Sequence, residues 1–120
     1  MISKSISILL PALDEAETIG QVIRKIPKSV LAKHGYNVNI VVVDGHSKDM
    51  TCAIAKSLGA KLLTQRGFGK GDAIKTAFKN FDGKYLFMLD ADNTYEPNDI
   101  LKMLPVITDI IGYSKHYKHL

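Results

Sequence analysis

The sequence predicts an α/β fold in which a mostly parallel, Rossmann-like sheet carries helices on both faces. Short apolar runs rich in β-branched or aromatic residues alternate along the chain with segments whose apolar residues recur every three or four positions. The first pattern is typical of buried strands and the second of amphipathic helices. Their alternation implies right-handed crossovers between parallel strands, and ligands of such sheets bind beyond the carboxyl ends of the strands.

The predicted strands span residues 6–10, 38–43, 61–63, 85–89 and 106–111. Pro11 ends the first of them, and the turn pair Asp44-Gly45 ends the second. The run at 85–89 does not alternate with polar residues, so both of its faces should be buried, as at the centre of a parallel sheet.

Four helices are predicted between and after these strands. In the first, Ile19, Val22, Ile23 and Ile26 fall at the spacing of one helix face, and Pro27 limits the helix. A second helix begins at residue 47 or 49 and ends at Gly59, where glycine suits the end of a helix. A third follows the glycine-rich loop at 67–71 and covers 73–81, and a short fourth begins at Pro97 and covers 100–104.

The composition favours one globular domain that binds an anion. The chain has 120 residues, 46% of them hydrophobic, and a formal net charge of +4. No block of lysine and arginine and no fold signature points to nucleic acid. One cysteine excludes an internal disulfide, and no apolar run approaches the ~20 residues of a membrane span. We expect a cytoplasmic protein, or one peripheral to a membrane, with a domain at 1–111 and an irregular tail at 112–120.

The segment Asp90-Ala91-Asp92 follows the most apolar predicted strand. Alternation along an extended chain sends both carboxylates to the same side. Two adjacent carboxylates repel each other, so a cation between or beside them would stabilise the pair. The simpler alternative is two solvated loop acids.

Three further segments follow the other predicted strands. In Pro11-Ala12-Leu13-Asp14-Glu15-Ala16, the acids either favour the start of a helix or accept hydrogen bonds from a ribose or base. In Asp44-Gly45-His46-Ser47, the acid either accepts from a nucleoside or forms a turn and cap. In Gly67-Phe68-Gly69-Lys70-Gly71-Asp72, backbone amides and a lysine suit a phosphate, although the alternative is a flexible turn. Together the four segments describe a crevice for a nucleoside diphosphate and Mg²⁺ or Mn²⁺.

These segments resemble the family-2 glycosyltransferases of the GT-A fold, and most closely the branch of polyprenyl-phosphate (dolichyl-phosphate) sugar synthases. The resemblance covers residues 5–104 and rests on Pro11 to Ile19, Val41 to Thr51, Gly69 to Ala73 and Met88 to Tyr95, in family order. It implies a UDP- or GDP-sugar donor and a lipid-phosphate or small-molecule acceptor, with transfer by inversion.

The resemblance also implies roles for individual residues. Glu15 and Asp44 would hold the nucleoside, and Gly69 and Lys70 would lie near the nucleoside or the diphosphate. Asp92 would ligate the metal directly, with Asp90 on the ribose or the metal, as in a DxD motif. The donor site would be completed by Pro11, Ala12, Leu13 and Ala91.

Two departures from the family bear on activity. Asp14 stands where the family usually has asparagine. Residues 109–114 resemble the start of a Gly-Ser-Arg segment without its arginine, and neither an acceptor half nor the usual general base follows. We therefore expect a truncated enzyme, and no catalytic residue is assigned.

Two alternative functions remain open. One is a non-catalytic donor-binding or interaction fragment, which could pair as a homodimer through an exposed apolar face. The other is a haloacid-dehalogenase-type phosphohydrolase, because Asp90 to Thr94 also fit a DxDxT pattern with a nucleophile and an acid/base. In that family, however, the motif normally ends the first strand, whereas three strand–helix units precede it here.

Overall fold

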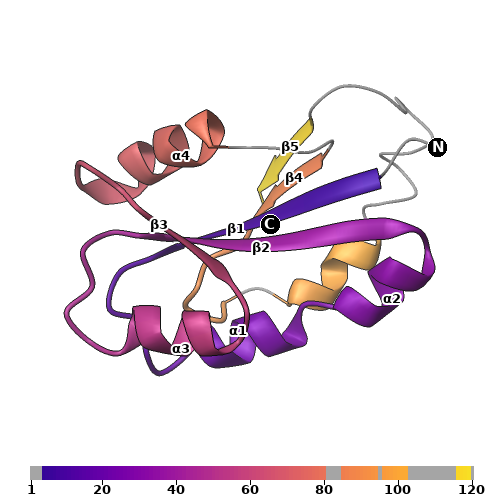
Figure 1. Ribbon diagram of the computed structural model, residues 1–120, viewed down its shortest axis with the longest axis horizontal. Helices are drawn as coiled ribbons and strands as arrows, with labels where there is room; N and C mark the ends of the chain where they lie inside the picture. Colours follow the sequence, from indigo (N-terminus) through magenta and orange to yellow (C-terminus); the bar gives the residue numbers. More distant parts are fainter. Residues whose placement is uncertain (1–3, 81–84, 95, 103–115, 120) are drawn as a thin grey trace.

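A computed structural model describes residues 4–80, 85–94, 96–102 and 116–119. Its five parallel strands form one sheet in the order β3-β2-β1-β4-β5. The strands are β1 (Lys4–Ala12), β2 (Tyr36–Asp44), β3 (Lys61–Thr64), β4 (Tyr85–Met88) and β5 (His116–His119). The helices are α1 (Ile19–Lys25), α2 (Lys28–Lys33), α3 (Thr51–Ser57), α4 (Gly69–Lys79) and the 3₁₀ turn η1 (Pro97–Asp99). Figure 1 shows this arrangement.

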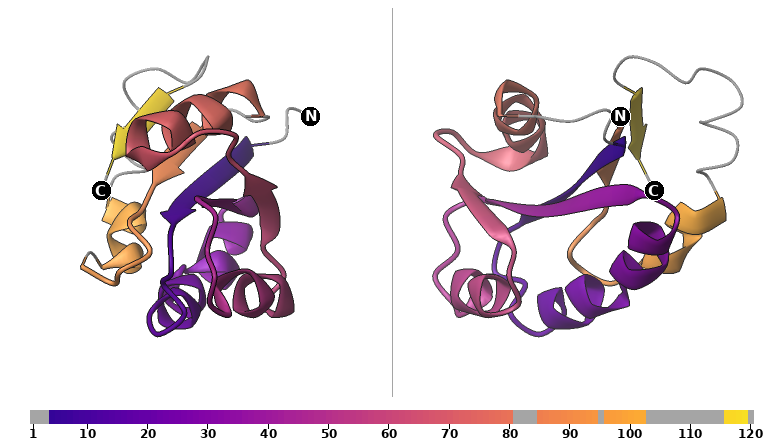
Figure 2. Two further views of the ribbon diagram at one scale, coloured as in Figure 1. Left: turned by 90° about the vertical axis from the view of Figure 1, so that its left-hand side faces the viewer. Right: turned by 45° about the vertical axis from the view of Figure 1, so that its right-hand side comes forward.

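Helices cover both faces of the sheet, as the sequence predicts. Figures 1 and 2 show α1, α2 and α3 on one face and α4 on the other. Successive side chains of β1 point to opposite faces of the sheet and pack in two separate hydrophobic clusters. Ile8 and Leu10 pack in the larger cluster with Val22 of α1, whereas Leu9 packs in the smaller cluster with Ala73 of α4. All four residues of β4 are buried, which confirms that this strand lies inside the sheet.

The structure extends two predicted elements, since β1 continues through Pro11 to Ala12 and α4 begins at Gly69, and it differs from the prediction in two further places. A separate helix, α2, follows Pro27, and it buries only Leu31, so it has no apolar periodicity to detect. In the predicted irregular tail at 112–120, His116–His119 instead form β5, which pairs with β4 through its backbone. A short edge strand of polar residues needs only this pairing on one side, so its sequence carries no strand signal. The strand predicted at 106–111 lies outside the described residues.

The register of the sheet brings the ends of three strands together. Pro11 and Ala12 of β1 align with Val43 and Asp44 of β2, and Leu9 aligns with Met88 of β4. Because the strands are parallel, the segments that follow β1, β2, β3 and β4 all emerge at one edge. These are the segments that the sequence singles out.

Candidate functional site

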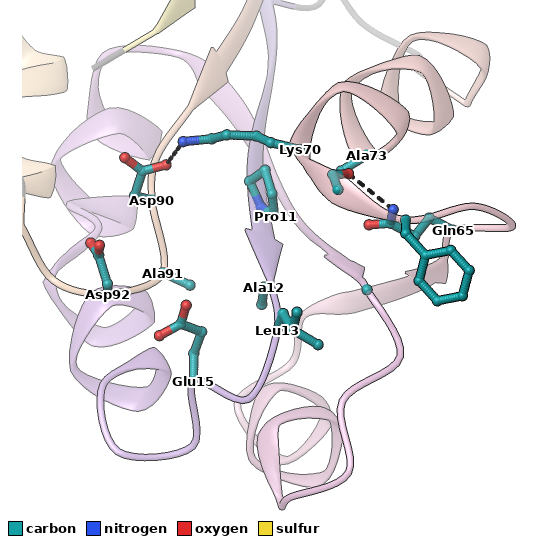
Figure 3. Close-up of a pocket in the computed structure, with 13 residues that line it drawn as sticks. Pro11, Ala12, Leu13, Glu15, Gln65, Lys70, Ala73, Asp90, Ala91 and Asp92 are labelled. Atoms are coloured by element: carbon teal, nitrogen blue, oxygen red, sulfur yellow. Dashed lines mark hydrogen bonds and ion pairs between the residues drawn. The ribbon is translucent and has the colours of Figure 1, made fainter.

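A pocket of about 300 Å³ lies at the carboxyl edge of the sheet (Figure 3). Its lining residues are Pro11, Ala12, Leu13, Glu15, Gly45, Gln65, Phe68, Gly69, Lys70, Ala73, Asp90, Ala91 and Asp92. Every residue predicted for donor binding is among them except Asp44. Segments that are distant in the sequence therefore meet around one cavity.

Charged groups form one side of the pocket. Lys70 reaches across from the start of α4 and pairs with Asp90 after β4, with 2.5 Å between Nζ and Oδ1 (Figure 3). Asp92 Oδ1 accepts hydrogen bonds from the Thr94 hydroxyl at 2.6 Å and the Thr94 amide at 3.1 Å. The hydroxyl bond is the main cause that lowers the pKa of Asp92. Asp92 is therefore held in its ionised form.

Glu15 faces the same acids from the loop after β1. Burial raises the pKa of Glu15, and the negative charge of Asp92 raises it further. Oxygen-only, anionic donors that repel one another suit a hard divalent cation. Among the described residues, no three His, Cys, Asp or Glu side chains converge as a ready-made metal site. A cation here would therefore take part of its coordination from a ligand or water, as Mg²⁺ commonly does.

Hydrogen bonds between two loops fix the position of Glu15. The backbone amides of residues 14–16, after β1, donate to Ser47 Oγ, Thr51 Oγ1 and Asp49 Oδ2, after β2, at 2.9, 2.9 and 3.2 Å. The amides of that loop are thereby satisfied by a different segment rather than by water. This arrangement holds the Glu15 side chain at the pocket.

The Asp14 side chain adds a hydrogen bond between the same two loops, as an acceptor. Its Oδ1 accepts from the Lys48 amide at 2.7 Å, and its backbone takes a φ of 52°, a region that Asp and Asn tolerate. Helix α1 begins only at Ile19 and has no acidic residue in its first turn. The Asp14 side chain thus accepts from the loop after β2 rather than from the start of α1. An asparagine at position 14 would offer the same acceptor oxygen.

Asp44 supports the pocket from behind. It is buried, and its Oδ2 accepts hydrogen bonds from the amides of His46 and Ser47, each at 3.1 Å. Its Oδ1 is buried and accepts no hydrogen bond from any nitrogen or oxygen atom of the described residues. The Cys52 thiol is a neighbour: burial raises the pKa of this thiol, and a hydrogen bond with Asp44 raises it further. The geometry thus favours the turn interpretation, in which Asp44 places Gly45 in the pocket wall.

Gln65, which the sequence analysis missed, organises the glycine-rich loop. This buried side chain donates from Nε2 to the carbonyls of Gly67 and Gly69, at 3.2 and 3.1 Å, and to Asp72 Oδ2 at 3.1 Å. Asp72 Oδ2 also accepts from the Gly67 amide at 3.0 Å. The loop is therefore tied down by side chains rather than flexible. The only signal in the sequence was a polar residue directly after a short strand.

Phe68 forms an apolar wall of the pocket. The sequence did not predict this role. Its side chain is 82% exposed, and its ring centroid lies 5.0 Å from that of His46. The His46 ring is held in turn by Nε2, which lies 3.0 Å from the carbonyl oxygen of Gly67. Gln65, from the same loop as Phe68, lies across the pocket from Asp90 and Asp92 (Figure 3). The pocket thus has a charged side and an aromatic side.

A sequence model of glycosyl transferase family 2 matches residues 7–110. The chain belongs to this family. Its relatives include glycosyltransferase AglJ of Haloferax volcanii, which is 40% identical over 110 residues that cover 91% of this chain and 34% of the relative. Along this family-2 chain, the strand that ends just before Asp90 is the fourth, β4, rather than the first, which argues against the haloacid-dehalogenase alternative.

Solved structures share the fold of this family-2 chain. Mannosyl-3-phosphoglycerate synthase from Rubrobacter xylanophilus superposes with a TM-score of 0.77 at 28% identity, covering 91% of this chain and 38% of that one. Glucosyl-3-phosphoglycerate synthase from Mycobacterium tuberculosis, in complex with Mn²⁺ and UDP-glucose, superposes with a TM-score of 0.73 at 27% identity, covering 89% and 40%. The fold is therefore that of the GT-A glycosyltransferases.

This family-2 chain spans about a third of the length of curated relatives that it matches, 34% for AglJ and 36% for a second glycosyltransferase. Within the described part of the chain, no helix combines the length and apolar character needed to cross a membrane.

Proposed function

We propose that this chain binds a nucleotide-diphosphosugar together with Mg²⁺ or Mn²⁺, as the donor-binding part of a family-2 glycosyltransferase. The observation that carries the proposal is one pocket with two unlike sides. The charged side supplies Glu15, Lys70, Asp90 and Asp92, and the other side supplies an exposed aromatic ring. A nucleotide-sugar has the same two-part chemistry, with a polyanionic diphosphate next to a planar base.

Each side of the pocket has a distinct task in this proposal. Asp92 and Asp90 would hold the cation, which supplies charge neutralisation for the diphosphate that leaves with the nucleotide. Lys70 provides a further positive charge near the phosphates. Glu15 accepts a hydrogen bond from a ribose hydroxyl, because its side chain lines the pocket near the two aspartates. The wall of Pro11, Leu13 and Phe68 excludes water from the base.

The transfer step and the acceptor belong to the whole protein and are part of the proposal. A hydroxyl or phosphate oxygen of the acceptor attacks the anomeric carbon with inversion, and the nucleoside diphosphate leaves. Two structural neighbours are synthases of mannosyl- and glucosyl-3-phosphoglycerate, which supports a phosphorylated small molecule such as phosphoglycerate. The resemblance to polyprenyl-phosphate sugar synthases supports a lipid phosphate at a membrane surface. Both acceptors carry a phosphate.

A second candidate is a donor-binding or pairing fragment without transferase activity, including a homodimer. It is favoured by the described residues themselves, which supply a donor pocket while no catalytic residue is assigned among them. Light scattering distinguishes a monomer from a dimer. A radiolabelled donor tests transfer, with 3-phosphoglycerate and a polyprenyl phosphate as separate acceptors. Label in neither acceptor, from a sample that binds the donor, would favour this second candidate.

Calorimetry tests donor binding. UDP, GDP, UDP-glucose and GDP-mannose are titrated with and without MnCl₂, and we expect at least one to bind only with Mn²⁺. Asp92→Asn should weaken that binding by roughly tenfold or more, since a charged ligand is lost. Asp99→Asn is the matched control, because Asp99 lies in η1 and pairs with Lys102 at 3.2 Å, outside the pocket. No heat from any nucleotide with a folded sample would refute the proposal.

A further inference from the structure

The ion pair between Lys70 and Asp90 spans the mouth of the pocket (Figure 3). Lys70 comes from the start of α4, on one side, and Asp90 from the segment after β4, on the other. The Lys70 side chain is 50% exposed and that of Asp90 19% exposed. The contact is therefore within reach of any ligand that enters from solvent.

The charge of Lys70 acts on both acids of the pair. It contacts Asp90 directly, and it contributes, after the hydrogen bonds from Thr94, to the lowered pKa of Asp92. Two adjacent carboxylates need a nearby cation, and here a side chain of the chain itself supplies one. A lysine suits this task because its ammonium is a compact charge on a flexible stem, which can leave one partner for another.

We propose that Lys70 is an internal counter-ion that occupies Asp90 when the chain is on its own and transfers to the donor diphosphate when a divalent cation takes the carboxylates. This inference rests on the proposed function of the pocket. A metal that arrives alone must break the contact between Lys70 and Asp90. A metal that arrives with a nucleotide also brings phosphate oxygens, which can accept hydrogen bonds from the Lys70 ammonium. The cation and the nucleotide therefore bind cooperatively, and Lys70 carries part of the coupling.

The expected sizes follow from the exposure of the contact. Half-exposed ion pairs contribute little, so removing Lys70 should strengthen the binding of Mn²⁺ alone by roughly two- to fivefold. A charge-assisted hydrogen bond to phosphate contributes more, so the same change should weaken nucleotide binding at saturating Mn²⁺ by roughly tenfold. The two effects have opposite signs, which a general loss of structure cannot produce.

The test uses Lys70→Met, which keeps the length of the stem and removes the charge. Lys75→Met, an exposed position on the same helix outside the pocket, is the matched control and removes the same net charge. Mn²⁺ binding is measured with MnCl₂ alone by electron paramagnetic resonance, and UDP or GDP binding by calorimetry in excess MnCl₂. Lys70→Arg retains the charge and should behave like the wild type with Mn²⁺ alone. Circular dichroism checks that each variant is folded.

Each other result overturns part of the inference. If Lys70→Met leaves Mn²⁺ binding unchanged or weakens it, Lys70 does not compete with the metal. If Mn²⁺ binds more tightly but nucleotide binding is unchanged, the transfer to the diphosphate is wrong. If Lys75→Met reproduces the effect, net charge rather than the ion pair is responsible. If the wild type binds no nucleotide with Mn²⁺, the proposed function fails together with the inference.

Discussion

At the scale of single residues, two neighbouring carboxylates of the pocket, Glu15 and Asp92, have opposite pKa shifts. Burial and the charge of Asp92 raise the pKa of Glu15 above its ordinary 4.5, whereas Thr94 lowers that of Asp92 below 3.8. As the pH falls, Glu15 therefore gains its proton first and Asp92 keeps its charge longest. The charge of Glu15, which acts on a cation held by Asp92 from a distance, is therefore lost at a higher pH than the charge of Asp92 itself.

This order predicts a two-step loss of Mn²⁺ affinity in a pH titration. A shallow decrease begins above pH 4.5, where Glu15 is protonated, and a steep decrease follows below pH 3.8 with Asp92. Glu15→Gln should remove the shallow step and keep the steep one, as measured by paramagnetic resonance of Mn²⁺. Glu17→Gln, an exposed neighbour, should retain both steps. A single step in the wild type would contradict the assignment of Glu15.

Phe68 provides a second prediction at this scale. An exposed aromatic ring at a pocket edge can stack on a base, and such stacking contributes ~1–3 kcal/mol by alanine substitution. Phe68→Ala should therefore weaken UDP or GDP binding and leave that of inorganic pyrophosphate unchanged, as measured by calorimetry with Mn²⁺. Phe78→Ala, also partly exposed but outside the pocket, serves as control. Equal losses for nucleotide and pyrophosphate would place the base elsewhere.

At the scale of elements, the loop between β3 and α4 depends on a close approach that only glycine permits. A Cβ atom at Gly67 would lie 2.8 Å from the Asp72 carboxyl group. This carboxyl group accepts a hydrogen bond from the Gly67 amide. The same carboxylate also accepts from Gln65, so displacing Asp72 removes two of the hydrogen bonds that hold the loop. The loop carries Phe68 and leads directly into the start of α4, from which Lys70 reaches across to Asp90.

Gly67→Ala should therefore weaken nucleotide binding several-fold and change global stability little, because the core clusters do not include this loop. Gly71→Ala is the matched control: it meets no atom within 4 Å and lies in α4, where alanine should stabilise by up to ~1 kcal/mol. Calorimetry measures binding and chemical denaturation measures stability. If both variants bind alike, the Asp72 anchor is not required.

Elements with strong apolar patterns could be predicted from the sequence, and those without them could not. Burial leaves an apolar pattern in the sequence, and this pattern predicts the core strands β1, β2 and β4. It also predicts the helix face of Ile19, Val22 and Ile23. Helix α2 buries a single leucine, and strand β5 pairs with β4 through its backbone. Neither element therefore has an apolar pattern in its sequence. The same holds for the pocket: its acids were predictable from their position after strands, whereas Gln65 acts through three contacts that exist only in the folded loop.

At the scale of the whole molecule, the pocket is shared by four segments that the sheet holds together. Ligands that bind only the folded chain raise its stability, by ~2.7 kcal/mol at a concentration of 100 times Kd. Mn²⁺ with a bound nucleotide should therefore raise the melting temperature, whereas either one alone should raise it less. Differential scanning fluorimetry measures this shift.

Asp92→Asn should abolish most of the gain and leave the melting temperature of the ligand-free chain nearly unchanged, because Asp92 lies outside both core clusters. EDTA added to the wild type with nucleotide should have the same effect. A gain that persists in EDTA would show that the nucleotide binds without the cation.

The central place of β1 in the strand order has a consequence for how this molecule can evolve. The acids that would take the cation follow β4, on one flank of β1, and the aromatic wall follows β3, beyond the other flank. Mutations in the second segment can alter which base is preferred without disturbing the first. Descendants of such a chain can thus diversify their donors while the cation chemistry is inherited intact.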